Sequence, residues 1–552
     1  MIRKLTALAL IMTLAGCASL PTRVDVRQGP ELIPDSSPEL TYYTPSGPIA
    51  GSGPEEIVSG FLAAGTGPQN GYGVAREYLS EDFAQRWQPD VGVLVRTGAP
   101  EFRSSGDSLQ IVQIKVGARI DEQGRYLDSD EPKTSSLRFQ LSKEAGEWRI
   151  SSAPNLTVVT PPVFAVVFNA FPVYFLDNTS KRLVPDLRWF PTRASTGTRL
   201  VNALLDGPAE GLAAGVVSAI PEGTKLTIDA VRVLEGVAQV DFDATALEAS
   251  ASNRRLMAAQ LRATLLQLAG VSDIAISVNS SPQDISAPPI IIESATGAPY
   301  ALSLLGVSRI TGGQGATLST TQNAVTQLEP ELFAIDSDAN RLAYATASGV
   351  YLAVSSSISF QNTLVSDATN IKFLTFDVNG FLWLFPRLAS DPIAVIDPLG
   401  NQRSIAQPVG NQRVSASLSP EGSRLALITQ GVNGPEILIF SILRAQSGYP
   451  FELVEADSLT PVLGQAFSLN WQDGSTLRVL ERTTSGLTAL SDYPLRGPRT
   501  QLSMPPVVGV KIVPGPSLTS TYLLSEAGEV WVLSGGTWRQ SKTAVIDIST
   551  LR

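Results

Sequence analysis

Gly380-Phe381-Leu382-Trp383-Leu384 places a glycine turn directly before an apolar strand, and this combination decides how the C-terminal half of the chain folds. It recurs from about residue 290 onward, with turn residues at Gly297, Ala339, Gly380, Gly422, Gly474 and Gly528. The intervals between these turns are 42, 41, 42, 52 and 54 residues. A period of about 40 residues built only of strands is typical of a β-propeller, in which each repeat is a four-stranded blade.

A similar apolar strand follows each turn: Tyr300-Ala301-Leu302, Leu342-Ala343-Tyr344, Leu382-Trp383-Leu384, Leu425-Ala426-Leu427, Leu477-Arg478-Val479 and Val530-Trp531-Val532. Six turns predict a propeller of six blades over residues 290–552. The two longer intervals predict loop insertions in the last two blades. The alternative is a β-sandwich whose strands share this spacing by accident.

Residues 163–285 mix strands and helices. The predicted strands are 173–176, 183–188, 226–233, 237–242 and 274–278, and the predicted helices are 200–205 and 253–268. Gly207-Pro208 ends the first helix, and the second places Met257, Leu261 and Leu265 on one face. This succession resembles the GerMN domain, named after a spore-germination lipoprotein. The resemblance implies an α+β fold and an envelope setting, and it implies no catalytic residues.

Three charged residues in this region are candidates for a site. Asp241 and Asp243 flank Phe242, so both carboxylates lie on one face of a strand, as an acid pair, a cation site or a solvated strand end. We favour the solvated strand end. Arg188 either binds a partner or pairs within the fold, and we favour pairing.

Residues 53–160 are predicted to begin with helices and to end with antiparallel strands. Gly53-Pro54-Glu55-Glu56 opens a helix, Ser80-Glu81-Asp82-Phe83 caps a later one, and 137–141 alternates strictly between apolar and polar residues. The order resembles the NTF2-like domains, which implies an α+β cone. Asp82 is the one acid candidate here, and a carboxylate at a helix N-terminus is more often a cap than a catalyst.

The N-terminal stretch carries the only cysteine of the 552 residues. Leu14-Ala15-Gly16-Cys17 is a bacterial lipobox behind a short positive segment and an apolar run too short to cross a bilayer. Residues 1–16 are therefore predicted to be a lipoprotein signal peptide, cleaved between Gly16 and Cys17. Cys17 is predicted to receive a diacylglycerol on its thiol and a palmitate-like chain on its amine. Residues 17–52, rich in Pro, Ser, Thr and Gly, are predicted to be a flexible tether.

Composition excludes several function classes. A net charge of -10 gives no electrostatic footprint for nucleic acid. The chain contains no histidine, which removes the commonest general base and metal ligand. Arginine outnumbers lysine 32 to 9, which indicates a GC-rich genome such as an actinobacterium's.

Motifs of common catalytic chemistry do not occur. The chain has no G-x-S-x-G, no S-x-x-K and no P-loop. Asp336-Ser337-Asp338-Ala339-Asn340 is similar to the start of a calcium loop, but Arg341 stands where that loop needs glycine and Ala347 where it needs the closing glutamate. We therefore interpret it as a propeller turn, and Gly312-Gly313-Gln314-Gly315 as a loop. No catalytic residue, metal or cofactor is predicted, and we expect the protein not to be an enzyme.

The order of parts, from lipobox through tether, cone and GerMN domain to propeller, resembles the LpqB family of actinobacterial lipoproteins over essentially the whole chain. The resemblance implies a lipid-anchored protein on the extracytoplasmic face of the cell membrane. Its implied partner is the extracellular domain of an MtrB-like sensor histidine kinase, in signalling that controls envelope homeostasis and division. The alternative is an envelope enzyme or glycan-binding protein that acts on peptidoglycan through the propeller.

Overall fold

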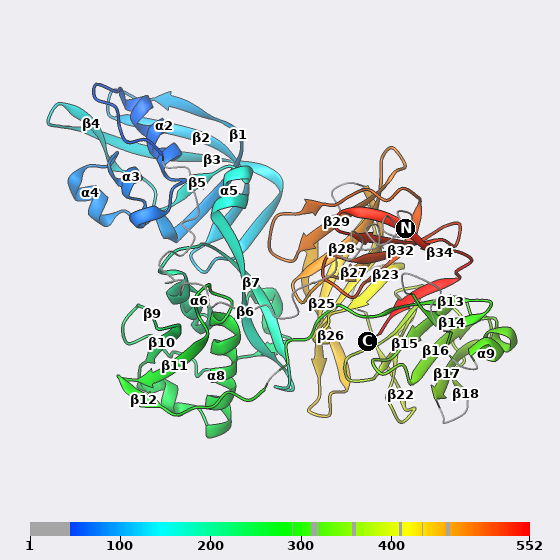
Figure 1. Ribbon diagram of the computed structural model, residues 1–552. Coiled ribbons are helices and arrows are strands. Elements are labelled where there is room, and N and C mark those ends of the chain that lie inside the picture. The colour runs from blue at the N-terminus through cyan, green and yellow to red at the C-terminus, as the bar shows by residue number, and fades with distance from the viewer. Residues whose placement is uncertain are drawn as a thin grey trace, which may run out of the picture. The chain divides into compact units, whose positions relative to one another are not determined.

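The computed structural model describes residues 45–289, 291–310, 317–318, 321–355, 360–407, 411–432, 434–459 and 464–551 (Figure 1). The chain divides into Met1–Thr44 and a compact unit, Pro45–Arg552. The predicted signal peptide, Cys17 and the tether up to residue 44 lie outside the described residues.

The first domain places short helices before a five-stranded sheet, as predicted. The helices are α2 (Pro54–Ala64), α3 (Gly73–Arg76) and α4 (Glu81–Arg86). The strands are β1 (Gly92–Ser104), β2 (Leu109–Asp121), β3 (Tyr126–Glu144), β4 (Glu147–Ser152) and β5 (Thr157–Val159), in the order β4-β3-β2-β1-β5. The prediction of antiparallel strands is wrong for β5, which runs parallel to β1.

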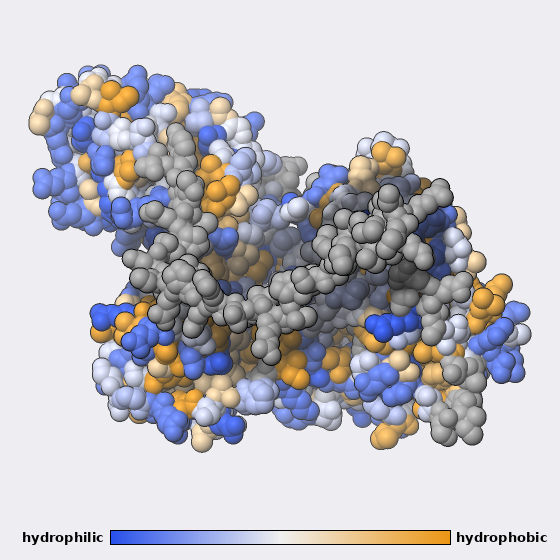
Figure 2. Space-filling model, in the orientation of Figure 1, coloured by the Kyte–Doolittle hydropathy of each residue, from blue (hydrophilic) through white to orange (hydrophobic). Residues whose placement is uncertain are grey.

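The core of this domain is aromatic, and its outer surface is hydrophilic. The ring of Phe61 meets those of Trp87 and Phe139 edge to face, with centroids 5.0 and 6.0 Å apart. Such pairs stabilise a core beyond the area they bury. In Figure 2 the visible surface of this domain, at upper left, is mostly hydrophilic with scattered apolar residues.

The second domain packs one long helix between a three-stranded and a four-stranded sheet. Its elements are α5 (Pro161–Val167), β6 (Phe168–Asp177), β7 (Leu183–Pro191), α6 (Thr196–Leu205), α7 (Glu210–Ala213), β8 (Val216–Val217), β9 (Arg232–Leu234), β10 (Val237–Phe242), α8 (Ala251–Leu265), β11 (Asp273–Val278) and β12 (Ser281–Gln283). The sheets run β7-β6-β8 and β12-β11-β10-β9. Met257, Leu261 and Leu265 of α8 are buried together in the core, as their spacing predicted.

The predicted strand over 226–233 is wrong for most of its length. Only Arg232–Leu234 pairs as β9, although Leu226 makes an isolated bridge to Phe242. The amide of Val231 donates instead to the hydroxyl of Thr198 in α6, at 2.9 Å. A hydroxyl of a neighbouring helix therefore accepts the backbone hydrogen bond that a strand partner would otherwise have accepted.

The third domain consists of six successive sheets in the described part of residues 299–550. Five have four strands: β15-β16-β17-β18, β19-β20-β21-β22, β23-β24-β25-β26, β27-β28-β29-β30 and β31-β32-β33-β34. Their bounds are β15 (Leu332–Ile335), β16 (Arg341–Thr346), β17 (Gly349–Ser355), β18 (Phe360–Ser366), β19 (Ile371–Phe376), β20 (Leu382–Pro386), β21 (Ile393–Ile396), β22 (Gln402–Ile405), β23 (Arg413–Leu418), β24 (Arg424–Gly431), β25 (Gly434–Arg444), β26 (Pro450–Leu459), β27 (Gly464–Trp471), β28 (Thr476–Thr483), β29 (Thr488–Pro494), β30 (Thr500–Gln501), β31 (Gly509–Pro514), β32 (Thr521–Ser525), β33 (Val530–Ser534) and β34 (Thr537–Lys542).

The sixth sheet joins the two ends of the domain. The last strand, β35 (Asp547–Thr550), pairs antiparallel with β13 (Pro299–Ser303), which pairs with β14 (Gly306–Arg309). A helix, α9 (Thr321–Leu328), packs on β14. Strands β15, β19, β23, β27, β31 and β35 each contact the next, and β35 contacts β15, so they form a closed inner ring. Closure removes the exposed sheet edges that an open array would present.

Two details of the predicted repeat are wrong. Gly297, Ala339, Gly380, Gly422 and Gly474 each precede the second strand of a sheet, but Gly528 precedes β33, the third strand of its sheet. Gly528 has φ +74°, close to the +73° of Gly422, so two different hairpins carry the same glycine signal. The extra residues of the β23-β24-β25-β26 sheet lengthen β25 and β26, which have 11 and 10 residues, where an inserted loop was predicted.

Candidate functional site

The second domain contacts the propeller through β7, α7 and the β6–β7 hairpin. The indole of Trp189 donates to the carbonyl of Arg496, at 2.6 Å. Arg182 reaches Glu293 at 3.2 Å and the side chain of Asn379 at 2.9 Å. These bonds join residues far apart in the sequence, so they fix the second domain against the propeller.

Three glycines let the two backbones approach closely at this joint. A Cβ added to Gly211 of α7 would overlap the carbonyl oxygen of Ala456 in β26. A Cβ on Gly474 would lie 2.6 Å from Pro185, and one on Gly497 would lie 2.7 Å from Trp189. Because real Cβ contacts are longer than this, only glycine fits at these positions.

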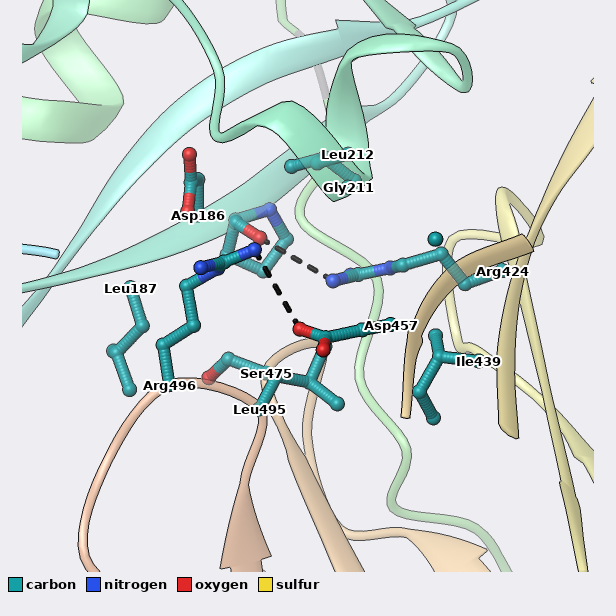
Figure 3. A pocket seen from close by; sticks show the side chains of 12 residues that line it. Asp186, Leu187, Gly211, Leu212, Arg424, Ile439, Asp457, Ser475, Leu495 and Arg496 are labelled. Carbon is teal, nitrogen blue, oxygen red and sulfur yellow. Dashed lines mark hydrogen bonds and ion pairs between the residues drawn. The ribbon is translucent and has the colours of Figure 1, made fainter. Parts of the chain in front are cut away.

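Charged residues, some of them buried and others half-buried, line the small cavity at the centre of the joint (Figure 3). Arg424 is paired with Glu421 at 2.7 Å and lies over the ring of Trp471, 5.0 Å from its centroid. Arg496 points toward Asp457 in Figure 3, and its guanidinium nitrogen lies 3.5 Å from a carboxylate oxygen of Asp457. Burial raises the pKa of Asp457, and the positive charge of Arg496 opposes that rise. The cavity encloses about 30 Å³, which is room for about one water molecule.

The junction of the second domain with the first is different. A polar cleft of about 750 Å³ lies there, lined by both domains. Asp90 of the first domain pairs with Arg193 and, at 3.2 Å, with Arg199 of the second. The guanidinium of Arg199 lies 4.4 Å from the ring centroid of Phe190. Burial lowers the pKa of Arg199, and Asp90 counteracts this by favouring the charged form.

Arg188 lies between the two junctions and pairs within the fold, which confirms the interpretation we favoured. Its side chain is fully buried, and it donates to Asp186 at 2.6 Å and to the carbonyl of Gly207 at 3.1 Å. It also reaches the carbonyl of Gln123, in the β2–β3 turn of the first domain, at 3.3 Å. Asp186 also lines the joint with the propeller.

The other predicted acids have structural roles. Asp241 accepts hydrogen bonds from the hydroxyl of Ser277 and the amide of Ser280, at 2.7 and 2.9 Å. Partial burial acts to raise the pKa of Asp241, but hydrogen bonds led by that of Ser277 outweigh it and lower the pKa. Asp243 caps a short 3₁₀ helix by accepting from the amide of Thr245. The pair therefore terminates a strand, and the structure does not join the two acids into one site.

Asp82 is exposed and pairs with Arg86 one helical turn away. The cap of α4 is Ser80, which accepts from the amide of Phe83 at 3.4 Å. The structure thus assigns capping to the neighbouring serine.

The calcium-like segment is a propeller turn, as we interpreted it. Asp336 accepts from the amides of Asn340 and Arg341 at 2.9 and 3.0 Å, and from the side chain of Arg341 at 2.9 Å. Within the described ranges no cluster of three or more His, Cys, Asp or Glu side chains is arranged to hold a metal. Gly312-Gly313-Gln314-Gly315 lies outside the described residues, as do Gly16 and Cys17.

Sequence reasoning missed the residues that build the two junctions. Arg182, Trp189, Arg496 and Asp90 carry no motif, and Gly211 lies in a short helix. Gly474 was identified only as a turn of the repeat. Gly207-Pro208 and Gly497-Pro498 lie at these junctions, but they are two of eight Gly-Pro pairs in the chain and so gave no specific signal.

No helix of the described part of the chain combines the length and the apolar character that a membrane crossing requires. Three family models match the chain. The N-terminal domain of lipoprotein LpqB matches residues 47–165, a family described as "Sporulation and spore germination" matches 172–284, and the LpqB β-propeller domain matches 306–547. These matches confirm the GerMN and propeller predictions.

Curated relatives named lipoprotein LpqB extend the comparison. The protein of Cutibacterium acnes is 31% identical over 50% of this chain and 46% of its own length, so the match spans about half of that relative. The protein of Bifidobacterium longum is 26% identical over 79% and 78%, and that of Streptomyces coelicolor 26% over 91% and 89%. Among solved structures, TolB from Acinetobacter baumannii is 14% identical over 53% of this chain and 72% of that chain, with a TM-score of 0.36.

Proposed function

Because the chain belongs to the LpqB family of lipoproteins, we propose that it is a lipid-anchored accessory protein on the extracytoplasmic face of the cell membrane. The lipobox assigns the anchor to Cys17, with cleavage after Gly16. Each buried CH₂ of an acyl chain contributes about 0.8 kcal/mol, and two or more chains on one residue give a stable anchor. The tether then holds the three domains near the membrane surface.

We further propose that these domains bind the extracellular part of an MtrB-like sensor histidine kinase and tune its output. The observation that carries this proposal is the joint between the second domain and the propeller. Gly211, Gly474 and Gly497 let the two domains pack at backbone distance, so a partner meets both in one fixed orientation. Fixed binding surfaces of this kind suit an adaptor, because the partner does not have to order them.

The candidate acids support binding over catalysis. Asp241, Asp243 and Asp336 each accept hydrogen bonds from nearby backbone amides, which consumes them in turns and caps. The matched family models are those of an N-terminal lipoprotein domain and a lipoprotein β-propeller, and neither description names an enzyme. The alternative, a peptidoglycan enzyme or glycan-binding protein acting through the propeller, predicts release or retention of wall fragments by the purified chain.

The experiment that tests the proposal removes the anchor and keeps every fold. Residues 1–17 are replaced by a cleavable signal without cysteine, and a reporter of the kinase's response regulator is measured in a deletion strain. Membrane confinement raises the effective concentration of two proteins, so a weak contact is occupied only by the anchored form. We expect the secreted form to remain folded and to fail to restore reporter output, whereas the unaltered chain restores it.

Cys17→Ala is the matched control, because it removes only the thiol and should abolish acyl labelling. Persistent labelling of Cys17→Ala would contradict the anchor. Full rescue by the secreted form at matched extracellular level would contradict the tethered adaptor, and release of sugar or peptide from purified wall would favour the enzyme.

A further inference from the structure

The polar cleft between the first and second domains is lined by charges of both signs. Its volume of about 750 Å³ lies in the range of small-ligand sites. A ligand of a single sign would meet like charges on part of this wall, which disfavours it, whereas a ligand that carries both signs fits. The wall holds three cations and four carboxylates: Arg193, Arg199 and Lys225, and Asp90, Glu122, Asp206 and Asp229.

Arg193 has donors that the fold leaves unused. Its Nη2 donates to Asp90, and in the described part of the chain this is the one hydrogen bond that the side chain makes. Its Nε is buried without an acceptor, which is rare in folded proteins. Arg199 pairs with the same carboxylate at 3.2 Å, so two guanidinium groups share Asp90. A ligand carboxylate at this end of the cleft supplies the acceptors that the fold lacks.

Two carboxylates gather at the other end of the cleft. Asp206 is exposed and ends helix α6. Asp229 is also exposed, and it accepts a hydrogen bond at 2.9 Å from the amide of Asn202, which lies one helical turn before Asp206. Among the described residues neither aspartate forms an ion pair with an arginine or a lysine. This end therefore fits the positive group of a ligand.

Helix α6 sets the distance between the two ends. Arg199 lies near its N-terminus and Asp206 follows seven residues later. At a rise of 1.5 Å per residue, the two positions are about 10 Å apart. The helix dipole favours an anion near the N-terminus and a cation near the C-terminus. The side chains and the helix dipole thus favour the same orientation of a ligand with two opposite charges.

We propose that this cleft binds a short, extended peptide by its two charged ends. The C-terminal carboxylate accepts hydrogen bonds from Arg193 and Arg199, and the N-terminal ammonium donates to Asp206 and Asp229. An extended chain advances about 3.3–3.6 Å per residue, so about three residues span the distance. The site is independent of the anchor and of the kinase proposal, because it uses only residues of the first two domains.

The test titrates the full chain with trialanine by calorimetry at fixed pH and ionic strength. We expect trialanine to bind. N-acetyl-trialanine, which lacks the ammonium, and trialanine amide, which lacks the carboxylate, should each bind at least tenfold more weakly. Dialanine should also bind more weakly than trialanine, because it is too short to reach both ends of the cleft.

Two variants assign the two ends of the peptide. Asp206→Asn should weaken trialanine at least tenfold and leave N-acetyl-trialanine unchanged, because that peptide has no ammonium. Arg193→Gln should weaken trialanine and leave trialanine amide unchanged. Asp206 makes no ion pair, so its variant tests the proposal even if Arg193→Gln loosens the junction. Asp284→Asn removes an exposed carboxylate of the same domain outside the cleft and is the matched control.

Absence of trialanine binding overturns the proposal, and so does equal binding of trialanine and its two blocked forms. An equal loss in Asp206→Asn and Asp284→Asn overturns it as well, because the affinity would then follow the net charge of the chain and not the ends of the peptide.

Discussion

The second domain meets its two neighbours in opposite ways, although β7 runs through both junctions. Toward the propeller it forms a close-packed joint in which Gly211, Gly474 and Gly497 allow backbone contact around a cavity of about 30 Å³. Toward the first domain it leaves a polar cleft of about 750 Å³ beside the ion pairs of Asp90. The comparison teaches that steric fit determines the first junction and that electrostatics determine the second.

The largest expected effect comes from Asp186, because its partner Arg188 lies between both junctions and is fully buried. Asp186→Ala leaves a buried guanidinium without its carboxylate and removes the acceptor of the Ala209 amide, at 2.7 Å. We expect a loss of about 3–5 kcal/mol in the free energy of unfolding, measured by chemical denaturation. Both junctions should loosen together.

Two further variants make this prediction specific. The double variant Asp186→Leu with Arg188→Met should recover much of the loss, because well-packed apolar residues replace a buried ion pair at little cost. Asp284→Ala removes an exposed carboxylate of the same domain and should change stability by less than about 0.5 kcal/mol. A loss as large in Asp284→Ala would contradict the role of the buried pair.

The second prediction separates the steric junction from the polar one. Gly211→Val forces a side chain against the Ala456 carbonyl, and overpacking of this kind costs about 1–3 kcal/mol. We expect limited proteolysis to cut faster between the second domain and the propeller. Ser195→Val adds similar bulk to the wall of the cleft, where residue 195 is exposed, and should leave the cutting rate unchanged. Equal effects of the two variants would mean that the two junctions do not differ.

The third prediction concerns the charges of the cleft. Asp90→Asn weakens both pairs with Arg193 and Arg199, whose exposure limits the loss to about 0.5–1 kcal/mol. Hydrogen exchange of the Gln123–Gly124 turn should quicken in this variant at low salt. Wild type should reach the same rate only when salt screens the pairs. Exchange around Ala456, at the close-packed joint, should respond to neither change.

The repeat could be predicted from the sequence because each second strand is a local signal, a turn residue that is mostly glycine followed by a short, mainly apolar strand. The same locality explains the error at Gly528, since the second hairpin of the last sheet carries a left-handed glycine too. Closure by β35 was implied by the repeat, because an array of blades needs both ends.

The junctions could not be predicted in this way. Arg424 and Pro185 are 239 residues apart, and a glycine required by another domain looks in the sequence like an ordinary turn glycine. Arg188 could be assigned to pairing in general, but its acceptors Gly207 and Gln123 depend on how three segments meet.

The smallest expected effect is a pH dependence of the close-packed joint through Asp457. Burial raises the pKa of this carboxyl, with Arg496 opposing the rise, so the folded chain holds its proton more tightly than the unfolded chain. Stability contributed by Asp457 is therefore present below the ordinary aspartate pKa and is lost as pH rises through the raised value. Asp457→Asn should remove this loss. Chemical denaturation between pH 3.5 and 6 would then show a flatter slope of the free energy of unfolding against pH. The change in that free energy should be no larger than for an ordinary surface substitution. Asp397 supplies a control of opposite sign, because the hydrogen bond from Asn401 leads the contacts that lower its pKa, so its contribution is lost as pH falls. If Asp457→Asn and Asp397→Asn changed the slope in the same direction, burial at the joint would not be what raises the pKa of Asp457.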